Sequence, residues 1–489
     1  MSSRIRTWLP LVLIVYFLYF FRLAGVGMLG PDEPRYAAIG REMAWSGDWI
    51  TPRLWGEPWF EKPALLYWMI GLGQRLGLGD DLSPRAPVAV LSAAFLLFFF
   101  VQLRRMFDAQ TASAATVLLG TSAFWIAFSQ VGTTDLPLAV WFSAAALLWA
   151  GWLKDGDGRV LPFAGIALGL AVLAKGLVPA VLAAPCLWFA RKRWKALLLV
   201  ATFAILAALP WYLAMTLRFG RAFLDDFFLR HHFQRFASDA LQHAQPWWFY
   251  IPILAGALFP WTPVLTLLGG RKLYRDPAVR CLGLTAAFGF VFFSAATNKL
   301  PGYLLPLLPS LCAVAAAALV RAARVRPVLA VSGVLLGLLP AAAAVLPPAL
   351  AKGITQTRVE AVNWGLCLAF AASGLAAWRL SAAKAVAVIA AVTCAGVVYL
   401  KVAAYPAMDA LVSARATWKQ IAPLAPEACV ESANRGWRYG LNYYSVQPLP
   451  DCAGTGRTVR ILQEPGRPAQ VERGTAMPIS YPSTSSGAR

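Results

Sequence analysis

The chain has 489 residues, of which 59% are hydrophobic and only 14% are charged, whereas a soluble domain carries about 25% charged residues. This composition excludes an ordinary soluble enzyme and predicts an integral membrane protein. The net charge of +21 would suggest a nucleic-acid partner in a soluble protein, but most basic residues fall in short loops between apolar runs, where membrane topology accounts for them.

Long apolar runs recur from residue 8 to residue 405. Continuous runs of this kind, without strict alternation, predict membrane-spanning helices of about 20 residues each. The first run, 8–21, follows two arginines as a signal peptide would, but no small-residue cleavage site precedes Asp32, so we expect it to be retained as a span. We predict about thirteen spans, near residues 8–27, 86–103, 112–130, 136–153, 160–174, 176–190, 196–217, 248–270, 280–297, 302–320, 327–347, 361–378 and 385–404.

Seven basic loops fall on one side of the membrane if every one of these runs crosses it, and the positive-inside rule assigns that side to the cytoplasm. The opposite face then carries the loop 30–85, the turn 130–135, Lys175, the loop 218–247 and the segment 298–303. Polar clusters that lie far apart in the sequence therefore converge on one surface, as in an assembled active site.

The loop 30–63, GPDEPRYAAIGREMAWSGDWITPRLWGEPWFEKP, holds far more charge than the runs around it. Charge held close to lipid is costly unless it is paired or functional. Residues 33–46 predict a short interfacial helix with Pro34 in its first turn, and residues 63–77 predict a second amphipathic helix. We expect this loop to carry the catalytic face of a membrane enzyme.

From about residue 405 the chain mixes proline, glycine, cysteine and aromatic residues, which predicts a small soluble α/β domain over 405–489. Residues 439–446, YGLNYYSV, predict a strand, and the Ser/Gly-rich end from 481 predicts disorder. Cys429 and Cys452 could form a disulfide if this domain lies outside the cytoplasm, although the sequence does not supply the geometry.

Three acids are candidates for contact with a substrate. Asp32 and Glu33 stand between a span and an interfacial helix, where they would touch a headgroup, and Asp135 heads a later span on the same face. A carboxylate partly removed from water is a better base, because burial disfavours its charged form. The alternative for Asp32 and for Asp135 is that each only caps a helix.

Several cations on this face are candidates for binding phosphate. Lys62 can bind phosphate as a point charge, or can form a simple ion pair with Glu61. Lys175 interrupts the apolar stretch LAVLAKGLVPA, where it is either functional or snorkels to the surface. Lys299 and Tyr303 both carry donors suited to phosphate.

The sequence 230–236, RHHFQRF, is the richest basic cluster of this face. His231 and His232 could ligate a divalent ion or could stack and donate hydrogen bonds, and Arg235 is suited to a bidentate phosphate contact. Glu61 could hold the same metal ion or orient Lys62.

Three blocks of the sequence carry a resemblance to a known family. DEPRYAAIGREMAWSGDWITPRLWGEPWFEKPALLYW (32–68), FQRFASDALQHAQPWWFYIP (233–252) and NKLPGYLLP (298–306) resemble bacterial GT-C-type glycosyltransferases. The nearest match is to the aminoarabinose transferases that modify lipid A, within the wider protein-mannosyltransferase-like superfamily. The resemblance covers roughly residues 8–320.

This resemblance implies an all-α polytopic GT-C-like catalytic domain over 1–404, in the bacterial inner membrane, with its active site on the periplasmic side. It implies inverting transfer of a sugar from a polyprenyl (undecaprenyl) phosphate to lipid A, another glycan or a protein. Asp32 matches the catalytic acid, which deprotonates or orients the acceptor. Lys62, Arg235 and Tyr303 match positions that contact the donor phosphate. Glu61, with His231 or His232, matches a region associated with a divalent metal ion.

Two other classes of protein share some of these features. A lipid or sugar transporter would place charges near mid-membrane and break helices in repeated halves, but here the charges gather at one face and no repeat is evident. A non-catalytic assembly protein could use the same fold and would be indifferent to Asp32→Asn. No Gly-rich phosphate cradle occurs, which disfavours a soluble nucleotide donor. We expect membrane lipids, and no nucleic acid, as partners.

Overall fold

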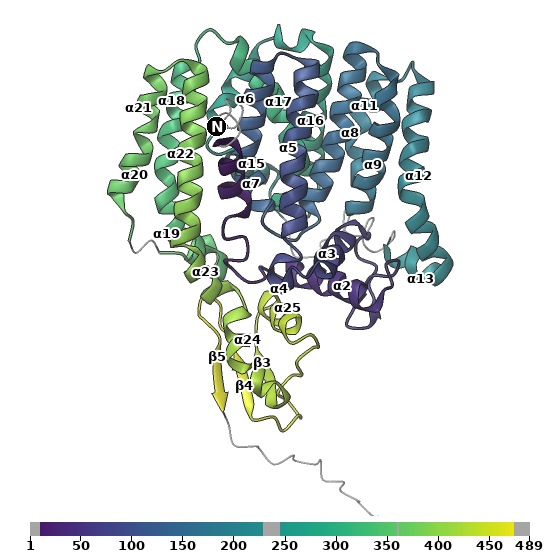
Figure 1. Cartoon of the computed structure of the whole chain (residues 1–489), viewed down its shortest axis with the longest axis vertical. Helices are drawn as coiled ribbons and strands as arrows, with labels where there is room; N and C mark the ends of the chain where they lie inside the picture. The colour runs from purple at the N-terminus through teal and green to yellow at the C-terminus, as the bar shows by residue number, and fades with distance from the viewer. Residues whose placement is uncertain (1–9, 228–244, 359–360, 474–489) are drawn as a thin grey trace, which may run out of the picture.

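The computed structural model describes residues 10–227, 245–358 and 361–473. Helices stand side by side in a bundle, and a smaller segment of helices and strands extends from one end of it (Figure 1). In the described part of the chain, eight helices are long and apolar enough to cross a membrane, and a ninth span is counted if the bent pair Trp247–Ala257 and Thr262–Gly269 crosses as one unit. The protein is therefore a multi-pass integral membrane protein.

The eight long helices agree with eight of the predicted spans. They are Gly79–Met106, which contains α5 (Ala86–Met106), α8 (Asp135–Asp155), Gly158–Lys175, which contains α9 (Leu161–Lys175), α12 (Trp194–Phe219), α16 (Pro277–Ala295), Pro301–Arg321, which ends in α17 (Leu308–Arg321), Arg326–Lys352, which contains α18 (Arg326–Leu335) and α19 (Leu339–Lys352), and α22 (Ala382–Ala403).

The remaining predicted spans are short or interrupted within the described residues. They contain the π-helix η1 (Tyr16–Phe20), α6 (Ala109–Gly120), α7 (Ala123–Phe128), α10 (Val178–Leu182), α11 (Ala184–Phe189), α20 (Trp364–Ala371) and α21 (Ser373–Arg379), while α15 (Tyr250–Ala257) and the 3-10 helix η5 (Thr262–Gly269) belong to the pair bent by 112°. The total of thirteen spans therefore stays a prediction.

Helix α8 lies at the centre of the bundle, since 89% of its 18-residue apolar stretch is buried inside the protein. Only 22% of the corresponding stretch of α12 is buried. Helix α9 packs between them through two glycines. A Cβ atom on Gly165 would lie 2.5 Å from the Val200 carbonyl oxygen of α12, and one on Gly169 would lie 2.5 Å from that of Ala204. The four-residue spacing of these glycines lets the two backbones approach closely, as membrane helices do at small-residue interfaces.

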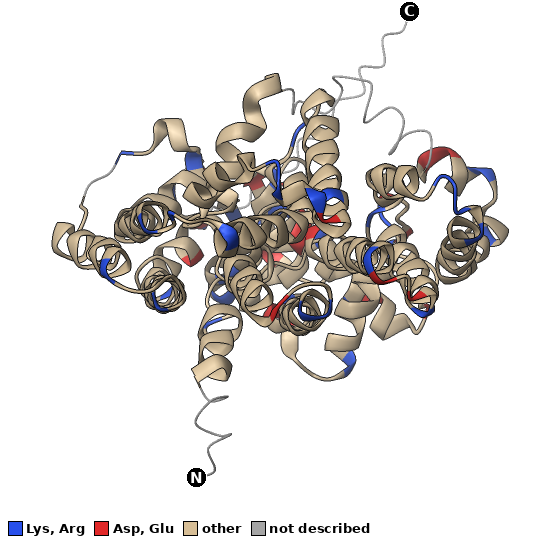
Figure 2. Cartoon of the chain, turned by 90° about the horizontal axis from the view of Figure 1, so that it is seen from above, with Lys and Arg blue, Asp and Glu red and all other residues tan. Residues whose placement is uncertain are grey.

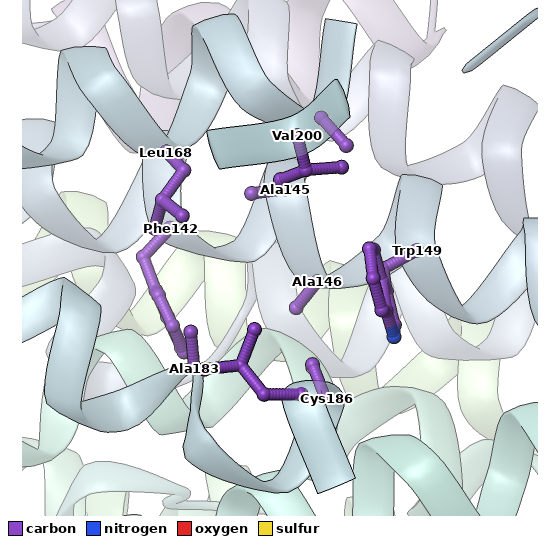
Figure 3. Close-up of a pocket in the computed structure, with 10 residues that line it drawn as sticks. Phe142, Ala145, Ala146, Trp149, Leu168, Ala183, Cys186 and Val200 are labelled. Carbon is purple, nitrogen blue, oxygen red and sulfur yellow. The ribbon is translucent and has the colours of Figure 1, made fainter. Parts of the chain in front are cut away.

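A small apolar void lies where α8, α9, α11 and α12 meet (Figure 3). Its volume is about 30 Å³, and alanines such as Ala145, Ala146 and Ala183 line it beside Trp149 and Cys186. Without polar partners a space of this kind does not hold an ordered water. The void is a packing gap left by small side chains, and it is not a site for a polar ligand.

The first loop lies along the same end of the bundle as the C-terminal segment (Figure 1). It forms α2 (Asp32–Ser46), the hairpin of β1 (Arg53–Leu54) and β2 (Glu57–Pro58), α3 (Leu65–Arg75) and α4 (Gly79–Leu82). Helix α2 ends at Gly47, which takes up the left-handed conformation with φ of 73°. The two helices predicted at 33–46 and 63–77 are confirmed.

The C-terminal segment begins with α23 (Tyr405–Val412) and α24 (Arg415–Ile421). Strand β3 (Ala428–Ser432) pairs in parallel with β4 (Val459–Leu462), and β4 pairs antiparallel with β5 (Gln470–Arg473). A disulfide joins Cys429 to Cys452, which resolves the pairing that the sequence left open.

The strand predicted at 439–446 is wrong, because these residues belong mostly to helix α25 (Arg435–Tyr444). The side chain of Asn434 accepts a hydrogen bond from the Trp437 backbone N–H and so caps the helix. Trp437 and Leu441, four residues apart, both face the core of the C-terminal segment. Helical spacing of the buried residues therefore overrides the aromatic composition that favoured a strand.

Candidate active site

A chain of four charged side chains connects α2 to the segment before α3. Arg35 contacts the carboxylate of Asp32 on one side and that of Glu61 on the other, with Nη1 at 3.2 Å from Glu61 Oε2. Lys62 Nζ lies 3.0 Å from the second oxygen, Oε1, of Glu61. The Asp32 side chain is 47% exposed while that of Arg35 is 4% exposed. We call these four residues the acid–base chain, and Asp32 is its accessible end.

Aromatic rings surround the Arg35 guanidinium. Its Cζ atom lies 5.4 Å from the ring centroid of Trp59 and 5.1 Å from that of Tyr439 in α25. Burial alone would lower the pKa of Arg35, but the carboxylates of Glu61 and Asp32 raise it, so the group stays charged. Arg35 therefore fixes the position of Asp32 as a permanent cation.

The β1–β2 hairpin contributes a strained residue to this region. Trp55 and Gly56 both have positive φ, of 55° and 86°, at the turn between the two strands. Such a conformation suits the tight hairpin turn but is rarely adopted by tryptophan. The Trp55 ring stacks on that of Tyr439, with centroids 5.8 Å apart and planes at 12°. Helix α25 thus holds the hairpin against the acid–base chain.

A second cluster lies at the start of α8 and the end of α9. Lys175 Nζ is 2.6 Å from Asp135 Oδ1 and 5.0 Å from the ring centroid of Tyr303. Gly302 is required here, because a Cβ atom at this position would lie 2.7 Å from Asp135 Oδ1. Asp135, Lys175 and Tyr303, predicted from three separate stretches of sequence, are therefore neighbours.

Glu33 brings the two clusters to the same end of the bundle. Its carboxylate is 0% exposed and binds Arg85 in bidentate fashion, with Nε at 2.7 Å and Nη2 at 2.6 Å. It also accepts hydrogen bonds from the backbone N–H groups of Leu29, at 2.8 Å, and Gly132, at 2.9 Å. The turn before α8 is thereby tied to the start of α2. Glu33, which we expected beside Asp32 at a headgroup, is a buried structural acid.

The alternatives left open by the sequence are also decided for several residues. Asp32 and Asp135 are the first residues of their helices, the capping positions are Pro31 and Thr134, and neither cap makes a side-chain hydrogen bond. Both acids are ion-paired instead. Lys175 is only 15% exposed and pairs with Asp135, so it does not simply snorkel to the surface.

The other predicted phosphate ligands differ in their surroundings. Lys299 is 5% exposed, and its Nζ donates to the carbonyl oxygens of Ala296 and Gln245, the latter at 2.9 Å. Lys62 pairs with Glu61. Arg235, His231 and His232 lie outside the described residues.

No group of three histidine, cysteine or acidic side chains that could hold a metal ion occurs among the residues that the structure describes. Glu61 is the described member of the predicted ligand set, and both of its carboxylate oxygens face cations, Arg35 and Lys62. Two positive neighbours oppose the approach of a third positive charge. The described residues therefore do not by themselves fit a metal ion.

Sequence reasoning missed Arg35 and Tyr439 as members of this site. The spacing of Asp32 and Arg35 by three residues on a helix was a usable signal for an ion pair. No comparable signal linked Tyr439 to a loop four hundred positions earlier.

Comparison with known proteins places the chain in a family. The undecaprenyl phosphate-α-4-amino-4-deoxy-L-arabinose arabinosyl transferase of Pseudomonas aeruginosa PAO1 is 35% identical over 401 residues, which cover 77% of this chain and 72% of that enzyme. The enzyme of the same name from Pseudomonas paraeruginosa PA7 is 34% identical over 400 residues, with the same two coverages. The chain belongs to this arabinosyltransferase family.

The match thus includes most of the relatives' length, and the family members are glycosyltransferases. Residues 61–217 also match the family described as dolichyl-phosphate-mannose-protein mannosyltransferase. This match begins at Glu61 and includes Lys62, Asp135 and Lys175. The predicted resemblance to GT-C glycosyltransferases is confirmed.

Solved structures agree with this membership at the level of the fold. The crystal structure of ArnT from Cupriavidus metallidurans bound to undecaprenyl phosphate superposes with a TM-score of 0.73 at 24% identity, over 91% of this chain and 85% of that one. Arabinosyltransferase EmbB from Mycobacterium smegmatis gives a TM-score of 0.52 at 15% identity, over 90% of this chain and 43% of that one. The arabinosyltransferase family member described here therefore has a GT-C fold.

Proposed function

We propose that this protein transfers 4-amino-4-deoxy-L-arabinose from undecaprenyl phosphate to lipid A, with inversion at the anomeric carbon. The names of the family members supply the donor lipid and the sugar. The observation that carries the proposal is the half-exposed carboxylate of Asp32, held by the buried Arg35 beside Lys62. An accessible acid and a set of cations at one membrane edge are the groups that such a transfer requires.

In the proposed reaction the bond between the anomeric carbon and the phosphate oxygen breaks as the acceptor oxygen forms a new bond on the opposite face of the sugar. The phosphate leaves with the bonding electron pair. Asp32 orients the acceptor oxygen and takes its proton where the acceptor carries one. Arg35, which is buried and ion-paired with Asp32, holds this carboxylate in position for the contact.

The leaving phosphate requires positive charge and hydrogen-bond donors. We assign this role to Lys62, Lys175, Tyr303 and Arg235, since donors arranged in advance stabilise the charge that develops in the transition state. Asp135 then acts by holding Lys175, which it contacts at 2.6 Å. Lys299 is engaged by two carbonyl oxygens, so we assign it to positioning the start of the Pro301–Arg321 span.

We further propose that the site lies on the periplasmic side of the bacterial inner membrane. The end of the bundle that carries both clusters is opposite the predicted basic loops, which the positive-inside rule places in the cytoplasm. Three ion pairs support a common face for those loops, since Arg105 binds Asp155 and Asp157, and Lys154 binds Asp276. The Cys429–Cys452 disulfide also suits an oxidising compartment.

The test compares lipid A from cells with the gene, without it, and with an Asp32→Asn variant. Mass spectrometry should detect the added aminosugar only with the unaltered gene, and purified Asp32→Asn protein should keep its thermal unfolding midpoint. Lipid A unchanged by deletion of the gene would refute the proposed acceptor. Full transfer by Asp32→Asn would instead favour an assembly protein or transporter.

A further inference from the structure

A second cavity lies near the opposite end of the bundle from the acid–base chain. Its volume is about 440 Å³, and it is lined by Trp152 near the end of α8, by Lys192 and Arg193 just before α12, and by Trp194 and Lys195 in the first turn of α12. Trp152 follows Asp135 by 17 residues on one continuous helix, which corresponds to about 25 Å at 1.5 Å per residue. The cavity is therefore separate from the candidate active site.

The cations of this cavity have no acidic partner in the described part of the chain. The nearby acids are paired with other cations of the same end: Asp155 and Asp157 bind Arg105, and Asp276 binds Lys154. The three lining cations Lys192, Arg193 and Lys195 thus leave a local excess of positive charge. Basic positions are spread over the ends of several helices in the view from above (Figure 2).

Aromatic rings hold two of these cations in place. The Arg193 guanidinium lies 5.0 Å from the ring centroid of Trp152, and Lys195 Nζ lies 5.8 Å from that of Trp194. A cation over an aromatic face is attracted by the ring and is partly ordered by it. The positive charge therefore stays at the cavity when no anion is present.

The rim of the cavity faces lipid. Trp194 is 62% exposed and Leu198, one turn further along α12, is 57% exposed. Helix α12 stands at the edge of the bundle and is the least buried of the eight long helices (Figure 1). Exposed tryptophan at the end of a membrane span marks the headgroup region, and apolar residues beyond it contact acyl chains.

We propose that this cavity binds the phosphodiester headgroup of an acidic phospholipid, whose acyl chains lie along the exposed face of α12. The uncompensated cations match a phosphate, and the exposed apolar surface directly beside them matches acyl chains. A free phosphate would use only the first of these features. Basic pockets between membrane helices at the cytoplasmic surface meet the leaflet that is rich in anionic lipid.

The test is native mass spectrometry of the delipidated full-length protein with phosphatidylglycerol and, separately, with phosphatidylcholine. Phosphatidylglycerol should bind more tightly. The combined variant Lys192→Gln, Arg193→Gln and Lys195→Gln removes three charges, so its binding should weaken about 100-fold at roughly 1 kcal/mol per charge. The matched control removes Arg321, Arg324 and Arg326, three exposed arginines in another predicted basic loop, by the same change to glutamine and should weaken binding less than about 3-fold.

Three results would overturn the proposal: equal weakening by the two triple variants, equal affinity for the two lipids, or competition by glycerol phosphate at the concentration of the lipid. The last result would show that a free phosphate suffices. If the triple variant does not fold, the single exposed Lys192→Gln should still weaken binding about 5-fold, and no change in that variant would equally refute the site.

Discussion

Asp32 and Glu33 are adjacent acids whose surroundings predict opposite consequences of removing their charge. Glu33 is fully buried and accepts four hydrogen bonds, two from Arg85 and two from backbone N–H groups. Glu33→Gln keeps the shape but leaves the Arg85 charge buried without its partner. Breaking one side of a buried pair costs about 3–5 kcal/mol. Asp32 is half-exposed, so Asp32→Asn should cost less than about 1 kcal/mol.

These energies correspond to measurable shifts in thermal unfolding. An unfolding entropy of about 2.1 cal/mol/K per residue gives about 1 kcal/mol/K for a chain of this length, so Glu33→Gln should lower the unfolding midpoint by about 4 °C. Asp32→Asn should lower it by less than about 1 °C. Detergent-purified variants followed by tryptophan fluorescence on heating provide the assay.

The double variant Glu33→Gln with Arg85→Met supplies the internal check. Because each single change leaves one buried charge alone, the double variant should lose less stability than the sum of the two single changes. Strictly additive losses, or equal midpoints for Glu33→Gln and Asp32→Asn, would refute the assignment of Glu33 as a buried structural acid.

Four further outcomes are expected. Arg35→Gln should reduce aminosugar transfer by at least about 100-fold, because Asp32 loses its fixed cation, and near-normal transfer in a liposome assay would contradict this. Gly169→Val should lower the unfolding midpoint of the purified protein, since its Cβ would meet the Ala204 carbonyl oxygen at 2.5 Å; an unchanged midpoint would contradict the packing argument. Cys429→Ser should make the C-terminal segment more sensitive to proteolysis, because closing a loop of 23 residues with a disulfide typically stabilises by about 3 kcal/mol; equal cleavage rates would show that the link adds nothing. Removal of divalent ions with EDTA tests the predicted metal at Glu61, His231 and His232: transfer should persist, because both carboxylate oxygens of Glu61 already face cations, and a loss of transfer that recovers on adding back metal would contradict this.

The long helices could be predicted from sequence because their apolar runs exceed the length needed to cross a membrane. The interrupted spans could not be predicted in the same way. The chain turns between α6 and α7 at Thr121 and Ser122, but mean hydropathy over a span-length stretch hides two such polar residues. At this turn the Thr121 hydroxyl accepts a hydrogen bond from the Trp261 indole at 2.8 Å. That contact comes from a residue 140 positions away, so no local pattern reports it.

The individual residues of the site could be predicted from the sequence more readily than the contacts between them. Asp135, Lys175 and Tyr303 were chosen because each is a polar group at the end of an apolar run, and the fold brings the three together. From the sequence, Asp32 and Glu33 were equal candidates for contact with the substrate, because which of two adjacent acids is buried depends on the packing of the folded molecule. The buried environment of Glu33 is formed by Arg85 of the next span together with the backbone N–H groups of Leu29 and Gly132.

The reach of α25 back to the first loop has a consequence for biogenesis. Arg41 donates to the Tyr443 carbonyl oxygen at 2.7 Å across 402 positions, and Tyr439 covers Arg35 from the same helix. During synthesis, the amino-terminal helices enter the bilayer long before the ribosome reaches this closing piece. A chain that stops before α25 (Arg435–Tyr444) should therefore insert into the membrane but lack the cover over Arg35, and we expect it to be inert in sugar transfer.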